Sequence, residues 1–345
     1  MSLLLLYVTC FLVAGTALSC LLTGAVCRYA IEAGLIDRPN ERSSHSFPTP
    51  RGGGVAIVVS CLLLAMALAA LGLIEPRLLT ATLGAGTVVA VLGFLDDRSS
   101  LAARWRFLGH AAAAAWVVFW LDHIPQVPVF GTLVNLHFIG PLIAGFYIVW
   151  MVNLFNFMDG IDGIASVEAI TSVLGGALLW WLAGSGSGWM LALVFASCVG
   201  GFLLWNFPPA KIFMGDAGSG FLGLMVALLS LWCGQSAPHL FWAWFILIGC
   251  FMVDGTTTLV RRVRRGDQFN EAHRSHAYQY AARQFGAHRP VTLAVGAINL
   301  LWLLPIAVAV ALGWLDGVVG VAIAYAPLLW LAFRFKAGDR AAQES

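Results

Sequence analysis

Three groups of acidic side chains lie at the ends of apolar stretches in this chain. They are Asp96-Asp97, the run from Asn153 to Asp162, and Asp216. A carboxylate near the interior of a membrane is costly and needs a partner that compensates its charge. Carboxylate oxygens suit Mg²⁺, which typically binds one or two of them together with phosphate groups. The residue types therefore predict a site for a metal ion and phosphates.

Asp216 lies in a segment rich in proline and glycine. Pro208 and Pro209 predict the end of one helix, and Gly215 allows the backbone to approach a ligand closely. Asp216 comes just before the apolar stretch 218–236, so it is either the N-cap of that helix or a Mg²⁺ ligand. The free N–H groups at such a helix start also favour phosphate. Lys211 would add a positive charge for a phosphate.

Asn153, Asn156 and Asp159 are spaced three residues apart and predict one polar stripe on a helix. Asp159 and Asp162 are each followed directly by glycine, and such Asp-Gly pairs are also typical of a plain turn. A turn alone does not need a polar stripe leading into it through an apolar stretch. We therefore favour the functional interpretation of this run.

Asp96 and Asp97 are adjacent, so each raises the pKa of the other unless a cation compensates. One is a candidate base and the other a candidate partner of a metal. Because Arg98, Arg104 and Arg106 follow closely, a cap closed by ion pairs is the alternative.

Two polar loops complete the set of candidates. His273 and His276 lie three residues apart, but this spacing alone is weak evidence for zinc, and they are expected to donate hydrogen bonds to a sugar or diphosphate. The segment 37–54 is basic and rich in turn residues, and it either orders over a phosphate or serves as a structured linker.

The composition indicates the scaffold that holds these residues. Of 345 residues, 60% are hydrophobic and only 10% are charged, which excludes a soluble or disordered protein. A net charge of +2, with basic residues confined to short loops, argues against nucleic acid as a partner. We predict an all-α polytopic membrane protein whose first span, within residues 1–27, is not cleaved. About eleven spans are expected, at 3–27, 52–74, 78–95, 107–121, 138–158, 163–183, 188–207, 218–236, 239–260, 290–313 and 317–333.

The distribution of Lys and Arg predicts the orientation. Eighteen of the nineteen basic residues lie in alternate loops and in the C-terminal segment, and Arg77 alone lies on the other side. The positive-inside rule makes the loaded side cytoplasmic, with the N-terminus periplasmic and the C-terminus cytoplasmic. Residues 1–345 are then one integral membrane domain with inner loops at 28–51, 96–106, 156–162, 206–217 and 261–289.

Five motifs in order carry a resemblance that covers nearly the whole chain. They are Asp37-Arg-Pro-Asn with His45 and Pro-Thr-Pro-Arg51-Gly-Gly, Gly93-Phe-Leu-Asp96-Asp97, the Asn153–Gly163 run, Pro209–Ser219, and His273-Arg-Ser-His276. The chain resembles the polyprenyl-phosphate N-acetylhexosamine-1-phosphate transferases, glycosyltransferase family 4, which are related to phospho-N-acetylmuramoyl-pentapeptide transferase. The His-Arg-Ser-His form resembles members that start O-antigen chains.

The resemblance implies a reaction and its participants. A sugar 1-phosphate, of GlcNAc or a 6-deoxy relative such as FucNAc or QuiNAc, would move from a UDP-sugar to undecaprenyl phosphate with release of UMP. Mg²⁺ is the implied cofactor, with Mn²⁺ as an alternative. The implied location is the bacterial inner membrane with the site facing the cytoplasm, and a homodimer is left open.

The resemblance also implies roles for individual residues. Catalysis would fall to Asp96, Asp97 and Asp159, and the metal to Asp216 and Asp97. The expected nucleotide-binding residues are Asn156, Asp159, Asp162, Asn206, Lys211 and Phe213. The expected sugar and diphosphate contacts are His273, Arg274 and His276. The lipid phosphate would meet His45, Arg51 and Arg106, where Arg106 replaces the lysine of many members and so binds phosphate differently.

Two other readings of the sequence have distinct requirements. A transporter would need ionisable residues near the middle of its spans, whereas Glu168 and Asp254 both lie near inner ends. An intramembrane prenyltransferase would need two Asp-rich motifs on comparable helices, and the Phe-Met-Gly-Asp and His-Arg-Ser-His loops do not fit that plan. The motifs also leave open whether the lipid phosphate attacks directly or an aspartate first forms a covalent intermediate.

Overall fold

The computed structural model describes residues 2–39, 47–99, 101–267 and 274–339 and consists almost entirely of helices. The α-helices are α1 (Ser2–Glu32), α2 (Gly54–Ala70), α3 (Pro76–Ser99), α4 (Ala103–Trp120), α5 (Gly140–Met158), α6 (Ile164–Leu182), α7 (Trp189–Asn206), α8 (Asp216–Ser236), α9 (Phe241–Leu247), α10 (Gly249–Arg264), α11 (Ala277–Phe285), α12 (His288–Ile298), α13 (Leu304–Ala311) and α14 (Gly317–Arg334). Short 3₁₀ turns η1 (His137–Ile139) and η2 (Pro238–Leu240) precede α5 and α9, and a π-helical turn η3 (Asn299–Leu303) joins α12 to α13. Strands β1 (Ile36–Asp37) and β2 (Thr49–Pro50) pair antiparallel, as do β3 (Val127–Val129) and β4 (Thr132–Val134).

The helices agree with a polytopic all-α membrane protein. In the described part of the chain, eight helices are long and apolar enough to cross a membrane, and the bent pair of η2–α9 and α10 raises the number to nine. Each of the eleven segments drawn from the sequence lies on helix, but α2 is a shorter apolar helix of 17 residues. The count of eleven spans therefore stays a prediction.

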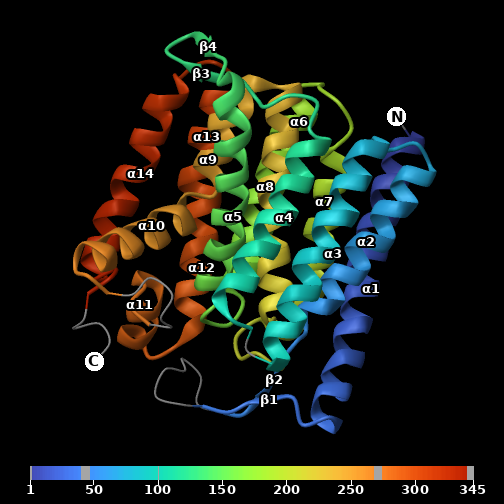
Figure 1. The fold of residues 1–345 in the computed structure, drawn as a ribbon, viewed down its shortest axis with the longest axis vertical. Helices are drawn as coiled ribbons and strands as arrows, with labels where there is room; N and C mark the ends of the chain where they lie inside the picture. The colour runs from blue at the N-terminus through green and yellow to red at the C-terminus, as the bar shows by residue number, and fades with distance from the viewer. Residues whose placement is uncertain (1, 40–46, 100, 268–273, 340–345) are drawn as a thin grey trace.

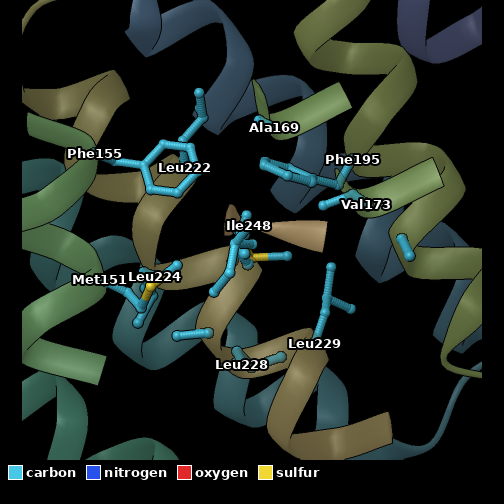
Figure 2. Packing of buried hydrophobic residues seen from close by; sticks show 14 of the residues in the cluster. Met151, Phe155, Ala169, Val173, Phe195, Leu222, Leu224, Leu228, Leu229 and Ile248 are labelled. Carbon is cyan, nitrogen blue, oxygen red and sulfur yellow. The ribbon is translucent and has the colours of Figure 1, made fainter. Parts of the chain in front are cut away.

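Helix α8 forms the centre of the bundle. It packs against α2, α3, α5 and α6, and its most apolar stretch is completely buried (Figure 1). Figure 2 shows the packing around it. Leu222, Leu224, Leu228 and Leu229 of α8 lie with Met151 and Phe155 of α5, Phe195 of α7, and Ile248. Since α8 is held on all sides, its first residue, Asp216, has a fixed position.

Two glycines bring neighbouring helices against the first turn of α8. A Cβ on Gly54 would lie 2.3 Å from Cα of Gly218, and a Cβ on Gly93 would lie 2.4 Å from the backbone nitrogen of Ala217. Small residues permit this close approach of helices in membranes. The start of α2 and the end of α3, which carries Asp96 and Asp97, are thereby placed beside Asp216.

The loops expected on the inner side lie together at one end of the molecule. Strands β1 and β2, the start of α4, and α11 lie at the lower end of Figure 1, whereas β3 and β4 lie at the upper end. Helix α1 begins at the upper end and finishes near β1. The grouping of the basic loops agrees with the charge pattern, and the assignment of that end to the cytoplasm stays a prediction.

Candidate functional site

The loop before α8 is joined to the loop before α2 by backbone hydrogen bonds. The N–H of Phe213 donates to the carbonyl of Pro50 over 2.8 Å, and the N–H of Gly53 donates to the carbonyl of Phe213 over 2.9 Å. This pairing, between segments more than 150 residues apart, places Arg51 beside Asp216.

Arg51 connects two of the predicted aspartates. Its Nη2 lies 2.7 Å from Oδ1 of Asp216 and 2.8 Å from Oδ1 of Asp97. Burial of Arg51 opposes its charge, but these two carboxylates outweigh that effect and raise the pKa of the guanidinium. The sequence assigned Arg51 to a lipid phosphate, whereas in the structure it neutralises the carboxylates that were expected to hold the metal.

Asp97 also caps α8. Its Oδ1 accepts the N–H of Asp216 at 3.0 Å, and its Oδ2 accepts the N–H of Ala217 at 3.4 Å. A carboxylate at a helix start satisfies N–H groups that have no partner within the helix and interacts favourably with the helix dipole. Asp216 is therefore not its own cap, because Asp97 from α3 serves that purpose.

Asp159 follows the last residue of α5 and is partly buried. Among the described residues, its carboxylate takes part in no hydrogen bond or ion pair. Desolvation raises the pKa of Asp159 well above its usual range, and repulsion from Asp216, Asp162 and Asp97 raises it further. Attraction by Arg51 lowers the pKa of Asp159 but does not offset these effects. The polar stripe predicted from the sequence thus ends on a carboxylate whose charge is only partly compensated within the described residues.

Asp96 points to a different partner from its neighbour. It accepts the backbone N–H of Leu101 at 2.6 Å and forms a 2.9 Å ion pair with Nη1 of Arg106. Asp96 is 8% exposed and Arg106 is 39% exposed, so the pair spans from the interior to the surface. The ion pair of that alternative is thus observed at Asp96, although the N-cap residue of α4 is Ala102 and no side chain caps it.

A groove runs from these carboxylates between the helices. It has a volume of about 320 Å³, and α3, α4, α5, α8 and α10 form its walls. Its polar lining consists of Asp96, Arg106, His110, Asn153, Asn156 and Asp216. Most of the remaining wall is apolar, including Phe107, Phe146, Val149, Trp150 and Leu259. We call it the apolar groove.

A second pocket opens on the loop side of the same cluster. It has a volume of about 580 Å³ and is lined by Phe47, Thr49, Asp162, Pro208, Pro209, Ala210, Phe213, Gln279, Ala282, Arg283, Gly286, Ala287, His288 and Arg289. The lining includes three basic residues, Arg283, His288 and Arg289, together with the aromatic residue Phe213. We call it the loop pocket.

Asp162 and Asn206 hold the wall of the loop pocket. Asp162 accepts the N–H of Ala210 at 3.0 Å and lies 3.2 Å from Nδ1 of His288. Asn206 is 3% exposed; it accepts the N–H of Gly163 at 2.9 Å and donates to the carbonyl of Ile212 at 2.9 Å. Asn206 thus joins two loops from within, and only Asp162 of these two lines the pocket.

Replacing Asn206 with leucine is expected to destabilise the protein. The N–H of Gly163 and the carbonyl of Ile212 would lose a buried partner, which we estimate costs about 2–4 kcal/mol. The measurement is the midpoint of thermal unfolding in detergent. Asn135→Leu is the matched control, because Asn135 is exposed and should change the midpoint little; an Asn206 variant as stable as the control would contradict this role.

The remaining predicted residues lie in different surroundings. Asn156 lines the apolar groove and donates to Oγ of Ser219 over 3.2 Å. Lys211 extends over the ring of Trp205, 5.5 Å from its centroid. His276 is 2% exposed and stacks on the Tyr278 ring. Arg274 is partly buried, whereas His45 and His273 lie outside the described residues.

Four residues of the loop pocket were missed by sequence reasoning. Gln279, Arg283, His288 and Arg289 all come from α11 and the start of α12. The His-x-x-His spacing directed attention to His276, which is buried, rather than to the helix that follows it. The available signal was that Arg283 and Arg289 belong to the same strongly basic inner segment.

The carboxylates of the site suit Mg²⁺ if a phosphorylated ligand completes its coordination shell. No group of three or more His, Cys, Asp or Glu side chains in the described ranges is arranged to hold a metal by itself. Asp159 and Asp216 nevertheless offer hard carboxylate oxygens that repel each other, although Arg51 already forms an ion pair with Asp216. Mg²⁺ commonly binds through one or two carboxylates with phosphates completing its shell, so the residues fit a metal that arrives with a phosphorylated ligand.

The chain is similar in sequence to several known proteins. Residues 79–234 match the model of glycosyl transferase family 4. The chain is 33% identical over 291 residues to a probable undecaprenyl-phosphate N-acetylglucosaminyl 1-phosphate transferase of Bacillus subtilis, covering 82% of this chain and 79% of that protein. It is 32% identical to a decaprenyl-phosphate N-acetylglucosaminephosphotransferase of Mycobacterium tuberculosis, covering 79% and 75%. A phospho-N-acetylmuramoyl-pentapeptide-transferase of Streptococcus equi is 31% identical over 51% of this chain and 54% of its own length.

Proposed function

Because this chain belongs to glycosyl transferase family 4, we propose that it transfers an N-acetylhexosamine 1-phosphate from a UDP-sugar to undecaprenyl phosphate and releases UMP. The observation that carries the proposal is that two separate cavities are each lined by aspartates of the site. The loop pocket includes Asp162 and Phe213, and the apolar groove includes Asp96 and Asp216. A soluble nucleotide in the loop pocket and a lipid in the groove would thus each lie beside acidic residues of the site.

The loop pocket is assigned to the sugar nucleotide. The ring of Phe213 offers a surface for a uracil base, as aromatic side chains do in nucleotide sites. Arg283 and Arg289 supply cationic donors for phosphate oxygens. His276 is buried behind this pocket, so its role in the proposal is to shape the loop rather than to contact the sugar.

The apolar groove is assigned to undecaprenyl phosphate. Its apolar walls suit isoprene units, and the groove lies between helices of a membrane-spanning bundle. Arg106 and Asn156 at its polar end carry donors for the lipid phosphate. The ion pair with Asp96 holds Arg106 at that end, which gives Asp96 a positioning role in place of the catalytic role expected from the sequence.

The transfer is a single in-line displacement at phosphorus. An oxygen of the lipid phosphate bonds to the β-phosphorus while the bond to the bridging oxygen breaks, and that oxygen leaves with UMP. A phosphate with its second pKa near 6 is already mostly ionised at neutral pH, so the residues must position it more than deprotonate it. Mg²⁺ held by Asp159 and Asp216 would neutralise the diphosphate. Arg51 keeps a positive charge beside Asp97 and Asp216 throughout.

We further propose that the site faces the cytoplasm of the bacterial inner membrane. UDP-sugars are made in the cytoplasm, and the basic loops around the site favour that side. The sugar is proposed to be GlcNAc or a 6-deoxy relative, and the product to start an O-antigen or related lipid-linked polysaccharide.

The test is an assay of the purified protein with Mg²⁺, undecaprenyl phosphate and a panel of UDP-N-acetylsugars. The expected result is UMP release, with one sugar clearly preferred and labelled sugar phosphate recovered in the lipid fraction. Reactions without lipid phosphate serve as the control for hydrolysis. Absence of UMP with every sugar, from protein that remains folded, would refute the transferase assignment.

Narrowing the apolar groove should affect the lipid substrate alone. Val149→Trp adds bulk to the groove wall, so we expect KM for undecaprenyl phosphate to rise about tenfold while KM for the UDP-sugar stays within about twofold. Leu142→Trp on the same helix is the control, because Leu142 is 74% exposed and does not line the groove. Equal rises for both substrates would indicate a general loss of packing instead.

A further inference from the structure

Helices α9 and α10 form a bent pair that, taken together with η2, is long and apolar enough for one span. They bend by 69° at Ile248, which is completely buried in the core shown in Figure 2. Such a break leaves the first N–H groups of α10 without partners in their own helix. Unpaired backbone groups are costly where water is absent, so the break requires an acceptor from elsewhere.

Glu168 of α6 supplies that acceptor. It is 0% exposed, and its Oε1 accepts the N–H of Phe251, in the first turn of α10, at 3.4 Å. Its Oε2 accepts Nδ2 of Asn299 at 2.7 Å, and the same amide donates to Oγ1 of Thr171. Asn299 is the first residue of the π-helical turn η3. One buried carboxylate on α6 therefore binds both α10 and η3, the turn that joins α12 to α13.

Asp254, one turn further along α10, fixes the start of α11. Its Oδ1 accepts the N–H of Ala277 and its Oδ2 accepts the N–H of Tyr278, both at 3.0 Å. Oδ1 also lies 3.3 Å from Nδ1 of His276, the N-cap residue, and accepts Oγ1 of Thr258 at 3.1 Å. A carboxylate on one helix thus caps another, with the charge that a helix start favours.

Helix α11 transmits this position to the site. The hydroxyl of Tyr278 donates to the carbonyl of Phe157, in the last turn of α5 and two residues before Asp159, over 3.0 Å. Gln279 and Arg283 of the same helix line the loop pocket. Leu259 of α10 lines the apolar groove. Helix α10 consequently carries walls of both cavities, but Asp254 acts only on the one that α11 forms.

We propose that Asp254 is a positioning residue for the sugar nucleotide, and that Glu168 fixes the root of the helix that carries it. The inference rests on the proposed function, because it assigns the loop pocket to the UDP-sugar. Neither carboxylate lines the loop pocket or the apolar groove, so their effect is indirect. Loss of Asp254 loosens α11 and the loop pocket alone, whereas loss of Glu168 loosens α10 and therefore both cavities.

The decisive variant is Asp254→Asn, measured in the same UMP assay against both substrates. An amide keeps one acceptor for α11 but loses the second and the charge, so KM for the UDP-sugar is expected to rise about tenfold. KM for undecaprenyl phosphate and kcat should stay within about twofold. Thr258→Val is the matched control, because it removes a donor to Asp254 but leaves the cap of α11 in place, and both KM values should stay at wild type.

Three further variants keep the proposal testable if Asp254→Asn does not fold. Tyr278→Phe removes the hydroxyl that bonds to the carbonyl of Phe157 and to the backbone of Gly160, and it should raise KM for the UDP-sugar alone. Glu168→Met removes the acceptor at the root of α10 and should raise both KM values, whereas Glu168→Gln, which retains an acceptor for Phe251, should restore them.

The outcomes distinguish the proposed function from the positioning role of Asp254. A wild-type protein that releases no UMP refutes the proposed function itself. A wild-type protein that turns over, with folded Asp254→Asn and Tyr278→Phe variants whose two KM values are unchanged or rise equally, overturns the positioning role.

Discussion

Asp216→Asn is expected to lower turnover by about 10³-fold or more, the scale of loss when a group that stabilises transition-state charge is removed. Asparagine keeps the shape of the side chain but removes the charge that would bind Mg²⁺. The fold should survive, because Arg51 retains its 2.8 Å contact with Asp97, and Asp97 still caps α8. The measurements are UMP release under saturating substrates and the midpoint of thermal unfolding.

The control for this variant is Asp122→Asn. Asp122 lies between α4 and β3 and forms an exposed ion pair with Arg77, so the same chemical change there should leave turnover unaltered. Turnover of Asp216→Asn above about a tenth of wild type would remove Asp216 from the metal site.

Asp159→Asn is expected to give a protein that is inactive yet more stable without metal. Desolvation and repulsion by Asp216, Asp162 and Asp97 together outweigh the attraction of Asp159 by Arg51, so neutralising this carboxylate removes a net unfavourable contribution from the metal-free fold. We expect the unfolding midpoint in chelator to rise by about 2–4 °C. Saturating Mg²⁺ with UMP should stabilise the wild type by about 2.7 kcal/mol at 100 times Kd, and the variant should lose most of this gain.

Asp162→Asn provides the contrast within the same loop. Its carboxylate already accepts the N–H of Ala210 and lies against His288, so its loss should lower the metal-free midpoint. If both variants shift the midpoint in the same direction, the repulsion argument for Asp159 is wrong.

Much of the scaffold could be predicted because it depends on local composition. Long apolar runs marked the helices, and the prolines after Asn206 marked the end of α7. The break at Ile248 was missed, since residues 239–260 read as one apolar stretch and contain no proline that would signal it. It depends on Glu168, which accepts the N–H of Phe251 in α10 and the side-chain amide of Asn299, and these residues are far apart in the chain.

The site was predicted as a set of residues but not as a set of partnerships. The sequence identified Asp96, Asp97, Asp159 and Asp216, each by its place beside an apolar run. It did not indicate that Asp97 caps α8 or that Arg51 joins Asp97 to Asp216, because these contacts join residues far apart in the chain. The His-x-x-His motif was recognised by its spacing, but this spacing did not indicate that His276 is buried.

The apolar groove and the loop pocket expose their two ligands to different kinds of diffusion. Arrival at the loop pocket depends on how many nucleotide molecules a volume of water contains. Arrival at a groove walled by α4, α5 and α10 depends on how many lipid molecules a given area of bilayer contains. The proper measure of the lipid substrate is therefore its surface density. Added inert phospholipid would lower this density and slow turnover, whereas added buffer would not.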